Sequence, residues 1–152
     1  MTAKTTADLT RLSIAQAGKL MSQGALSASE LTNAFLERID AVDHKIASYI
    51  TVTADLARAA AQQADMEMKG GVRRGPLHGI PVALKDICET AGVLTTGHSH
   101  LRKDYVPAID AETVRRLKAA GAVLLGKLGT HEFANGAMTP DQPFPAVRNP
   151  WN

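Results

Sequence analysis

The residues best able to do chemistry lie at the end of a short apolar run. Lys85 and Asp86 directly follow Val82-Ala83-Leu84, and a turn rich in Gly and Pro precedes the run. Such a run is typical of a buried strand. Burial disfavours the charged form of a lysine, so a lysine at a strand end can become a neutral base. The local pattern alone favours the simpler interpretation, a solvated Lys85 paired loosely with Asp86.

Five histidines raise the question of a metal site. His98 and His100 are two positions apart, and His131 precedes Glu132. Zinc needs ligands that converge in tetrahedral geometry, and residues 131–135 read H-E-F-A-N, which departs from the H-E-x-x-H pattern. We therefore predict polar histidines near a cleft and no metal site. The run G-K-L-G-T over 126–130 lacks the spacing of a phosphate-binding loop, so we discount that interpretation as well.

Other nucleophiles receive little support from the sequence. Cys88 is the single cysteine, which rules out a disulfide within the chain and suits a reducing cytosol. No histidine follows it closely, so we expect a small buried cysteine rather than a reactive thiol. The order of residues also reveals no self-contained Ser-His-Asp arrangement. A binding or scaffold module therefore remains open at this point.

Composition excludes several classes of function. The chain has 152 residues, 45% of them hydrophobic, which is enough for the core of one ordinary domain. A net charge of +2 and an aromatic content of 4% argue against a nucleic-acid surface or an anionic-membrane surface. Residues 1–12 lack the apolar stretch of a signal peptide, and no run is long enough to span a bilayer. We expect a cytoplasmic protein.

Residues 1–70 are predicted to form a mainly helical layer. Ser13 can cap one helix, and Ser27 with Glu30 forms a capping box that begins a second, amphipathic helix. The expected elements are a loose polar arm over 1–11, helices over 13–23, 27–42 and 54–69, and a strand over 48–53. This layer holds no group of residues that we would assign to catalysis.

Residues 71–152 are predicted to begin an α/β core. Strands are expected over 82–85 and 122–125, with a helix over 111–120 between them that Asp110 caps. Strand, helix and strand in this order favour parallel pairing through a right-handed crossover. From Gly126 the chain is expected to loop, and four prolines predict an extended, irregular segment over 137–152. No linker separates the two parts, so we predict a single domain over 1–152.

Several strings together resemble the amidase signature family, whose members are serine hydrolases that cleave amide bonds. They are G-P-L-H-G-I-P-V-A-L-K-D over 75–86, A-G-V-L-T-T-G over 91–97, G-K-L-G-T-H-E-F-A over 126–134 and R-N-P-W-N over 148–152. Their order and spacing match the family from about residue 76 onward. The resemblance implies an α/β fold with a mixed sheet flanked by helices, of which this chain is the N-terminal portion. It also implies that the family's Gly/Ser-rich nucleophile segment lies beyond Asn152.

The resemblance implies a mechanism in which Lys85 is the base. In the family a Ser-cisSer-Lys relay activates the nucleophilic serine, an acyl-enzyme forms, and water releases the acid after ammonia or an amine has left. Both serines would come from beyond Asn152, and no cofactor is expected. Phe133 and Ala134 are candidates for lining the acyl pocket, although a core anchor fits Phe133 equally well. Asp86 is either a conformational support or a turn residue, and Lys127 is expected to pack or pair structurally.

A second type of member of the same family provides the alternative. The A component of the amidotransferase that delivers ammonia to misacylated transfer RNA shares these motifs. We rank it second, because Ile87-Cys88 follows Lys85-Asp86 and because residues 134–150 look more like the stand-alone amidases. A noncatalytic fragment or binding module is the third possibility. The expected partners are a small-molecule amide, the missing C-terminal portion of the same enzyme and a second copy in a homodimer, with no nucleic acid and no membrane.

Overall fold

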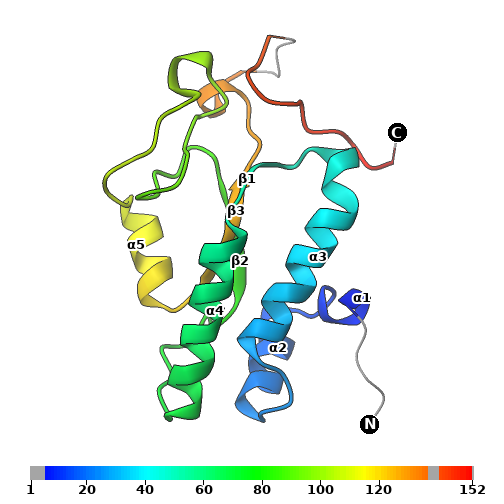
Figure 1. Ribbon diagram of the computed structural model, residues 1–152, viewed down its shortest axis with the longest axis vertical. Helices are drawn as coiled ribbons and strands as arrows, with labels where there is room; N and C mark the ends of the chain where they lie inside the picture. The colour runs from blue at the N-terminus through cyan, green and yellow to red at the C-terminus, as the bar shows by residue number, and fades with distance from the viewer. Residues whose placement is uncertain (1–5, 137–140, 152) are drawn as a thin grey trace.

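The computed structural model describes residues 6–136 and 141–151 and places helices beside a small sheet (Figure 1). The mixed α/β class expected from the sequence is confirmed. In chain order the elements are α1 (Thr6–Leu9), α2 (Ile14–Ser22), α3 (Ala28–Ile46), β1 (Tyr49–Val52), α4 (Ala54–Lys69), β2 (Pro81–Lys85), the 3₁₀ turn η1 (His100–Arg102), α5 (Glu112–Ala119), β3 (Val123–Leu128) and the 3₁₀ turn η2 (Glu132–Ala134).

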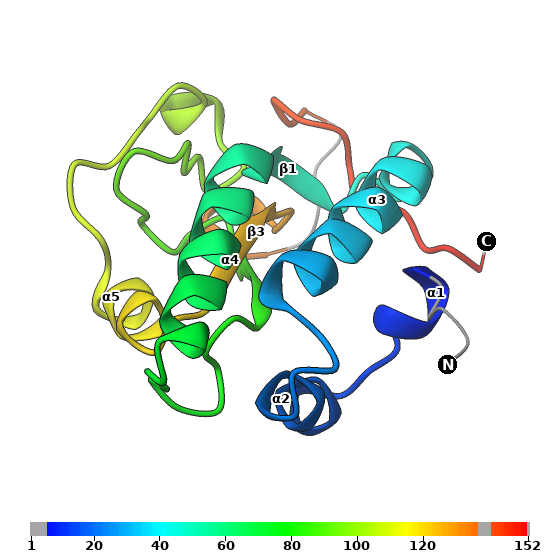
Figure 2. The same cartoon turned by 60° about the horizontal axis from the view of Figure 1, so that its bottom comes forward.

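The sheet joins the two parts of the chain. Within the described residues it has three strands in the order β1-β3-β2. β2 and β3 are parallel, as the strand-helix-strand order predicted, whereas β1 is antiparallel to β3. β1 belongs to the first 70 residues, so the helical layer and the α/β part share one sheet. Figure 2 shows α3 and α4 side by side, and both contact β3.

The starts of two helices follow from local sequence. The Ser13 side chain accepts from the amide of Gln16, and the Gln16 side chain accepts from the amide of Ser13. Ser27 and Glu30 form the same reciprocal pair at the start of α3. Each capping box satisfies amides that a helix start leaves unpaired. The box at Ser27 and the cap at Ser13 are where the sequence predicted them, whereas the part of Gln16 in the first box was not predicted. The helix α3 continues four residues beyond its expected end at 42.

A carboxylate of α4 also caps α3. The two oxygens of Asp65 accept from the amides of Ala28 and Ser29 at 2.7 and 3.1 Å. A negative charge is favourable at a helix N-terminus, where amide dipoles point outward. This contact fixes how the C-terminal half of α4 lies against the beginning of α3.

A second carboxylate holds the start of β1. Asp43, near the end of α3, accepts from the amides of Ser48 and Tyr49 at 2.8 and 3.1 Å. At the other end of the strand, the hydroxyl of Thr53 donates to the carbonyl of Leu124 at 2.8 Å. β1 is therefore anchored to α3 at its start and to β3 at its end.

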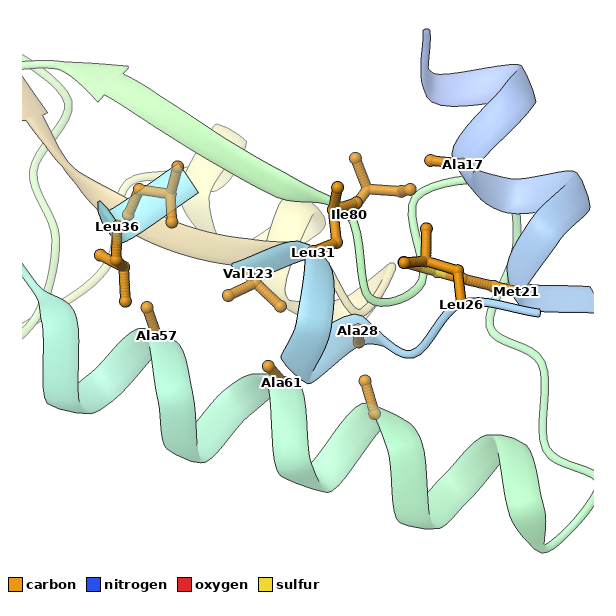
Figure 3. Close-up of a cluster of buried hydrophobic side chains, with 12 residues drawn as sticks. Ala17, Met21, Leu26, Ala28, Leu31, Leu36, Ala57, Ala61, Ile80 and Val123 are labelled. Atoms are coloured by element: carbon orange, nitrogen blue, oxygen red, sulfur yellow. The ribbon is translucent and has the colours of Figure 1, made fainter. Parts of the chain in front are cut away.

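The apolar core lies between α3, α4 and the sheet. Figure 3 shows Ala57 and Ala61 of α4 pointing toward Leu31, Leu36 and Val123. Small side chains let helix backbones approach closely, so the alanines bring α4 near its neighbours. The buried cluster consists of Ala17, Met21, Leu26, Ala28, Leu31, Leu36, Ala57, Ala61, Ala64, Ile80, Val123 and Leu125. None of the helices in the described residues is long and apolar enough to cross a bilayer.

The expected loop after 125 is wrong, because β3 continues to Leu128. Strands on both sides of β3 supply hydrogen-bond partners, and these partners lie far away in the sequence. Gly126 allows the continuation. Its φ is +155°, and a Cβ there would lie 2.2 Å from the carbonyl oxygen of Thr51. The register with both neighbouring strands shifts close to this glycine, so the strand passes Gly126 with a bulge.

Two further expectations need correction. Asp110 does not cap α5: the residue before that helix is Ala111, and the Asp110 carboxylate instead accepts from the amide of Ala91 and pairs with Lys118. The expected loose arm contains the short helix α1, and its residues 1–5 lie outside the described part. Of the expected extended segment, residues 141–151 contain neither helix nor strand, and residues 137–140 and 152 lie outside the description.

Candidate functional site

Lys85 ends β2 with its side chain exposed. Its neighbours Leu84 and Asp86 are buried, as expected where successive side chains of a strand point to opposite faces. Within residues 6–136 and 141–151, no group forms a hydrogen bond or ion pair with the Lys85 ammonium. The described residues therefore leave this side chain open to solvent.

Asp86 is fully buried. Its amide, its carbonyl and its Oδ2 form hydrogen bonds, whereas its Oδ1 has only an ion-pair contact. Its amide donates to the carbonyl of Leu128 at 3.0 Å, and its carbonyl accepts from the amide of Gly97 at 2.9 Å. Its Oδ2 accepts from both the amide and the hydroxyl of Thr96, at 2.8 and 2.6 Å. Its Oδ1 lies 3.5 Å from the Nζ of Lys127. Asp86 is thus a support inside the fold rather than an exposed turn residue.

Lys127 is the buried counterpart of Asp86, with no exposed surface on its side chain. Its Nζ donates to the carbonyl of Cys88 at 2.8 Å and to the hydroxyl of Thr95 at 2.7 Å. Burial lowers the pKa of the Lys127 ammonium below its ordinary value, and attraction to Asp86 opposes that shift. The contacts match the structural pairing expected for Lys127. Cys88, expected to be buried, is partly exposed.

The segment over 95–99 is a loop whose residues are all buried. His98 adopts a φ of 55°, and its ring nitrogens lie 2.7 Å from the carbonyl oxygen of Thr130 and 3.1 Å from that of Phe144. Both ring nitrogens therefore face backbone carbonyl oxygens. In the part of the chain that the structure describes, no three His, Cys, Asp or Glu residues gather in a way that could hold a metal ion.

Phe133 and Ala134 lie in η2 with left-handed backbones, at φ values of 48° and 60°. Side chains rarely tolerate this conformation, and strained residues of this kind cluster at functional sites. The amide of Phe133 donates to the carbonyl of Gly97 at 2.8 Å. The Phe133 ring lies so close to Gly97 that a Cβ there would be 2.9 Å from its Cδ1. Phe133 is 45% exposed among the described residues.

A second contact fixes η2 to the buried segment. The hydroxyl of Ser99 donates to the Oε1 of Glu132 at 2.6 Å. Together with the Gly97–Phe133 bond, it holds η2 against the segment over 95–99. Hydrogen bonds thus connect the strand end that carries the Lys85 amine with an exposed, strained turn, and the connection runs through buried polar residues. We call Asp86, Thr95, Thr96 and Lys127 the buried polar network.

Sequence reasoning missed Lys127, Thr95 and Thr96 as members of this site. One signal was present: β3 reads V-L-L-G-K over 123–127, a second apolar run that ends in lysine, just as β2 reads V-A-L-K over 82–85. Because β2 and β3 are parallel neighbours, the ends of both runs meet at one edge of the sheet. The register pairs Leu84 with Lys127 and Lys85 with Leu128.

Another polar cluster lies at the C-terminal end of α4. The Nε2 of His78, which is buried, lies 3.1 Å from the Oε2 of Glu67, and its Nδ1 accepts from the amide of Arg74 at 3.2 Å. Hydrogen bonds from Arg74 and then from Gln63 lower the pKa of Glu67 to about 2. A cavity of about 330 Å³ opens beside this cluster, between α4 and the turn at Gly121.

The sequence of this chain is similar to those of known proteins. A family model described as Amidase matches residues 30–152. The A subunit of the Glutamyl-tRNA(Gln) amidotransferase from Anaeromyxobacter sp. (strain K) is 46% identical over 145 residues, which are 95% of this chain and 30% of that protein. The chain therefore spans less than a third of the length of this curated relative.

The backbone also superposes on solved structures of amide-cleaving enzymes. Native peptide amidase from Stenotrophomonas maltophilia superposes with a TM-score of 0.78 at 39% identity, over 82% of this chain and 26% of that one. A fatty acid amide hydrolase superposes with a TM-score of 0.78 at 25% identity, over 85% of this chain and 23% of that one. The similar backbones belong to proteins named for different amides.

Proposed function

Because this chain belongs to the amidase family, we propose that it is part of an enzyme that hydrolyses a carboxylic amide to an acid and ammonia or an amine. The observation that carries the proposal is the end of β2. Lys85 presents its amine on the open side of the strand, while Asp86 is locked beneath it. An outward amine on a rigid strand end is suitably placed to activate a group that approaches from outside the described residues.

In the proposed reaction, the neutral amine of Lys85 takes a proton from a bridging serine. That serine takes the proton of a nucleophilic serine, whose oxygen attacks the amide carbonyl. The C–N bond breaks as the leaving nitrogen receives the proton, and the acyl-enzyme that remains is hydrolysed by water. A serine is a weak nucleophile without an adjacent base. Both serines would come from residues outside this chain, and the same segment would desolvate Lys85 as it packs on the open side.

Phe133 and Ala134 are proposed to line the acyl pocket. Phe133 is exposed in spite of its size, and its strained backbone is fixed to the segment over 95–99. An exposed, rigidly held ring provides an apolar wall for the acyl group of a small-molecule amide.

The second candidate is the A component of an amidotransferase. The identity of 46% to a protein of that name supports it. In that case the ammonia released from a donor amide would pass to a second substrate through partner polypeptides. The two functions differ in a simple measurement: a stand-alone amidase releases ammonia from simple amides without any other polypeptide.

The test uses the longer protein that contains this chain. Ammonia release is measured on a panel of primary amides for the wild type, for Lys85→Ala and for Lys69→Ala, which replaces an exposed lysine at the end of α4. We expect Lys85→Ala to lower kcat by at least about 1,000-fold, since removal of one member of a catalytic relay costs that much or more. Lys69→Ala should keep wild-type activity. Amide hydrolysis that survives Lys85→Ala would overturn the assignment of the base.

A further inference from the structure

We propose that Asp86 is a positioning residue that sets the place of Lys85 relative to Phe133, and that Lys127 keeps its carboxylate in position. The inference rests on the proposed function, in which Lys85 is the base and Phe133 lines the acyl pocket. It assigns a role to a buried ion pair that the reaction itself does not use.

The first step concerns the direction of Lys85. Asp86 is bonded through its amide, its carbonyl and its carboxylate, to Leu128, Gly97 and Thr96. These bonds come from different segments, so the residue cannot rotate without breaking several of them at once. Because adjacent strand residues point to opposite faces, an inward Asp86 forces Lys85 outward. The orientation of the proposed base is thus decided by its neighbour, since the described residues make no polar contact with the Lys85 amine itself.

The second step concerns the path from Asp86 to the pocket. The carbonyl of Asp86 accepts from the amide of Gly97 at 2.9 Å, and the carbonyl of Gly97 accepts from the amide of Phe133 at 2.8 Å. Gly97 has a φ of +61°, and its missing side chain leaves room for the Phe133 ring. Two consecutive backbone hydrogen bonds therefore connect Asp86 to Phe133. Asp86 is the shared attachment of the proposed base and the proposed pocket wall.

The third step explains Lys127. A buried carboxylate is unfavourable unless it is paired and hydrogen-bonded. Lys127 supplies the opposite charge, and it also donates to Cys88 and Thr95. Cys88 follows closely after Lys85, and Thr95 directly precedes Thr96, so Lys127 ties together the two ends of the segment between them. The pair therefore holds both the strand end and the segment that leads to Phe133.

The experiment measures kcat and KM in the longer protein for a small amide, acetamide, and a bulky one, phenylacetamide. The main variant is Asp86→Asn, which keeps the shape and removes the charge. The control is Asp104→Asn, an exposed carboxylate paired with Lys103. We expect Asp86→Asn to lower kcat by about 10- to 100-fold with little change in KM for acetamide, because a misplaced catalytic group affects the chemical step. The preference for phenylacetamide over acetamide should also fall, whereas Asp104→Asn should change neither quantity.

Thr96→Val keeps the test decisive if Asp86→Asn fails to fold. It removes the hydroxyl bond to Asp86, together with the bond that this hydroxyl accepts from the amide of His98, and it leaves every charge in place. We therefore expect kcat to fall by about 3- to 10-fold with acetamide KM unchanged. The double variant Asp86→Asn with Lys127→Met removes both charges and should not regain wild-type kcat. Wild-type kcat in folded Asp86→Asn, in Thr96→Val or in the double variant would overturn the inference.

The two proposals fail in different ways. Lys85→Ala is measured alongside the other variants. Wild-type hydrolysis in Lys85→Ala would overturn the assignment of Lys85 as the base, and the positioning role of Asp86 would fall with it. Inactive Lys85→Ala together with fully active Asp86→Asn would overturn the positioning role alone and leave the proposed function standing.

Discussion

Two buried regions of this molecule are stabilised by different means. Between α3, α4 and the sheet, burial is achieved with alanine, leucine and valine. At the carboxyl ends of β2 and β3, the buried residues are instead polar, namely the buried polar network of Asp86, Thr95, Thr96 and Lys127. The apolar layer gains free energy from area removed from water, which depends little on direction. The polar network gains almost nothing unless each donor meets its acceptor.

The difference shows what each region contributes to a site. An apolar layer tolerates small shifts of one helix against another, because its contacts change gradually with distance. A network of hydrogen bonds and charges loses its balance when one partner moves away. A side chain that must be aimed, such as Lys85, is therefore better attached to the polar network. The apolar layer provides the rigid support behind it.

The largest loss of stability is expected for Lys127→Met, which tests the buried polar network. Methionine fills similar volume, but it leaves the carboxylate of Asp86 buried without its countercharge. Breaking a buried pair on one side is expected to lower the free energy of unfolding by about 3–5 kcal/mol. Urea denaturation of the longer protein measures the loss. Asp86→Asn combined with Lys127→Met should cost clearly less than Lys127→Met alone, and equal losses would contradict the pairing.

In the apolar layer, Leu31→Ala gives the matching test. Leu31 is 2% exposed and lies against α4, so truncation removes buried methyl groups and leaves a cavity. We expect a loss of about 2–5 kcal/mol in the same denaturation experiment. Leu56→Ala, at a residue of α4 that is 58% exposed, is the matched control and should change stability by about 0.5 kcal/mol or less. Similar losses in both variants would contradict the assigned core.

The smallest effect is expected at the cluster of Glu67, Arg74 and His78, because the Arg74 side chain that pairs with Glu67 is open to solvent, which weakens the interaction. Glu67 has a pKa of about 2 in the fold, against an ordinary value of 4.5. A lowered pKa contributes stability above pH 4.5 that is lost as the pH falls toward about 2. Glu67→Gln should therefore flatten the decline in stability over this acid range. An unchanged acid profile would contradict the paired state of Glu67.

Local signals predicted the helices well. The capping boxes at Ser13 and Ser27 and the alanine-rich stretch over 54–69 depend on neighbours in the sequence, and the structure has helices at all three places. Asp110 was predicted wrongly for a reason that is not local. Its carboxylate pairs with Lys118 and with the amide of Ala91, which lies on another segment.

The candidate site was predictable only where a residue acts alone. Lys85, Phe133 and Ala134 stood out through the family resemblance, and their proposed roles stay predictions. Supporting roles were expected for Asp86 and Lys127, but the contacts of the buried polar network were not predicted, because Lys127 meets its partners Cys88 and Thr95 across 39 and 32 positions of sequence. The extension of β3 has the same origin: its hydrogen-bond partners on β1 and β2 come from distant parts of the chain.

The position of β1 in the chain has a consequence during synthesis. Thr53, next to β1, bonds to Leu124 across 71 positions, so at roughly 5–20 residues per second the strand waits about 4–14 s for its partner to be made. An unpaired strand is open to wrong pairing during that time. The two amides that Asp43 holds, those of Ser48 and Tyr49, need only α3 to be present. This clamp can keep the nascent strand folded back on its own helix until the ribosome has delivered β3.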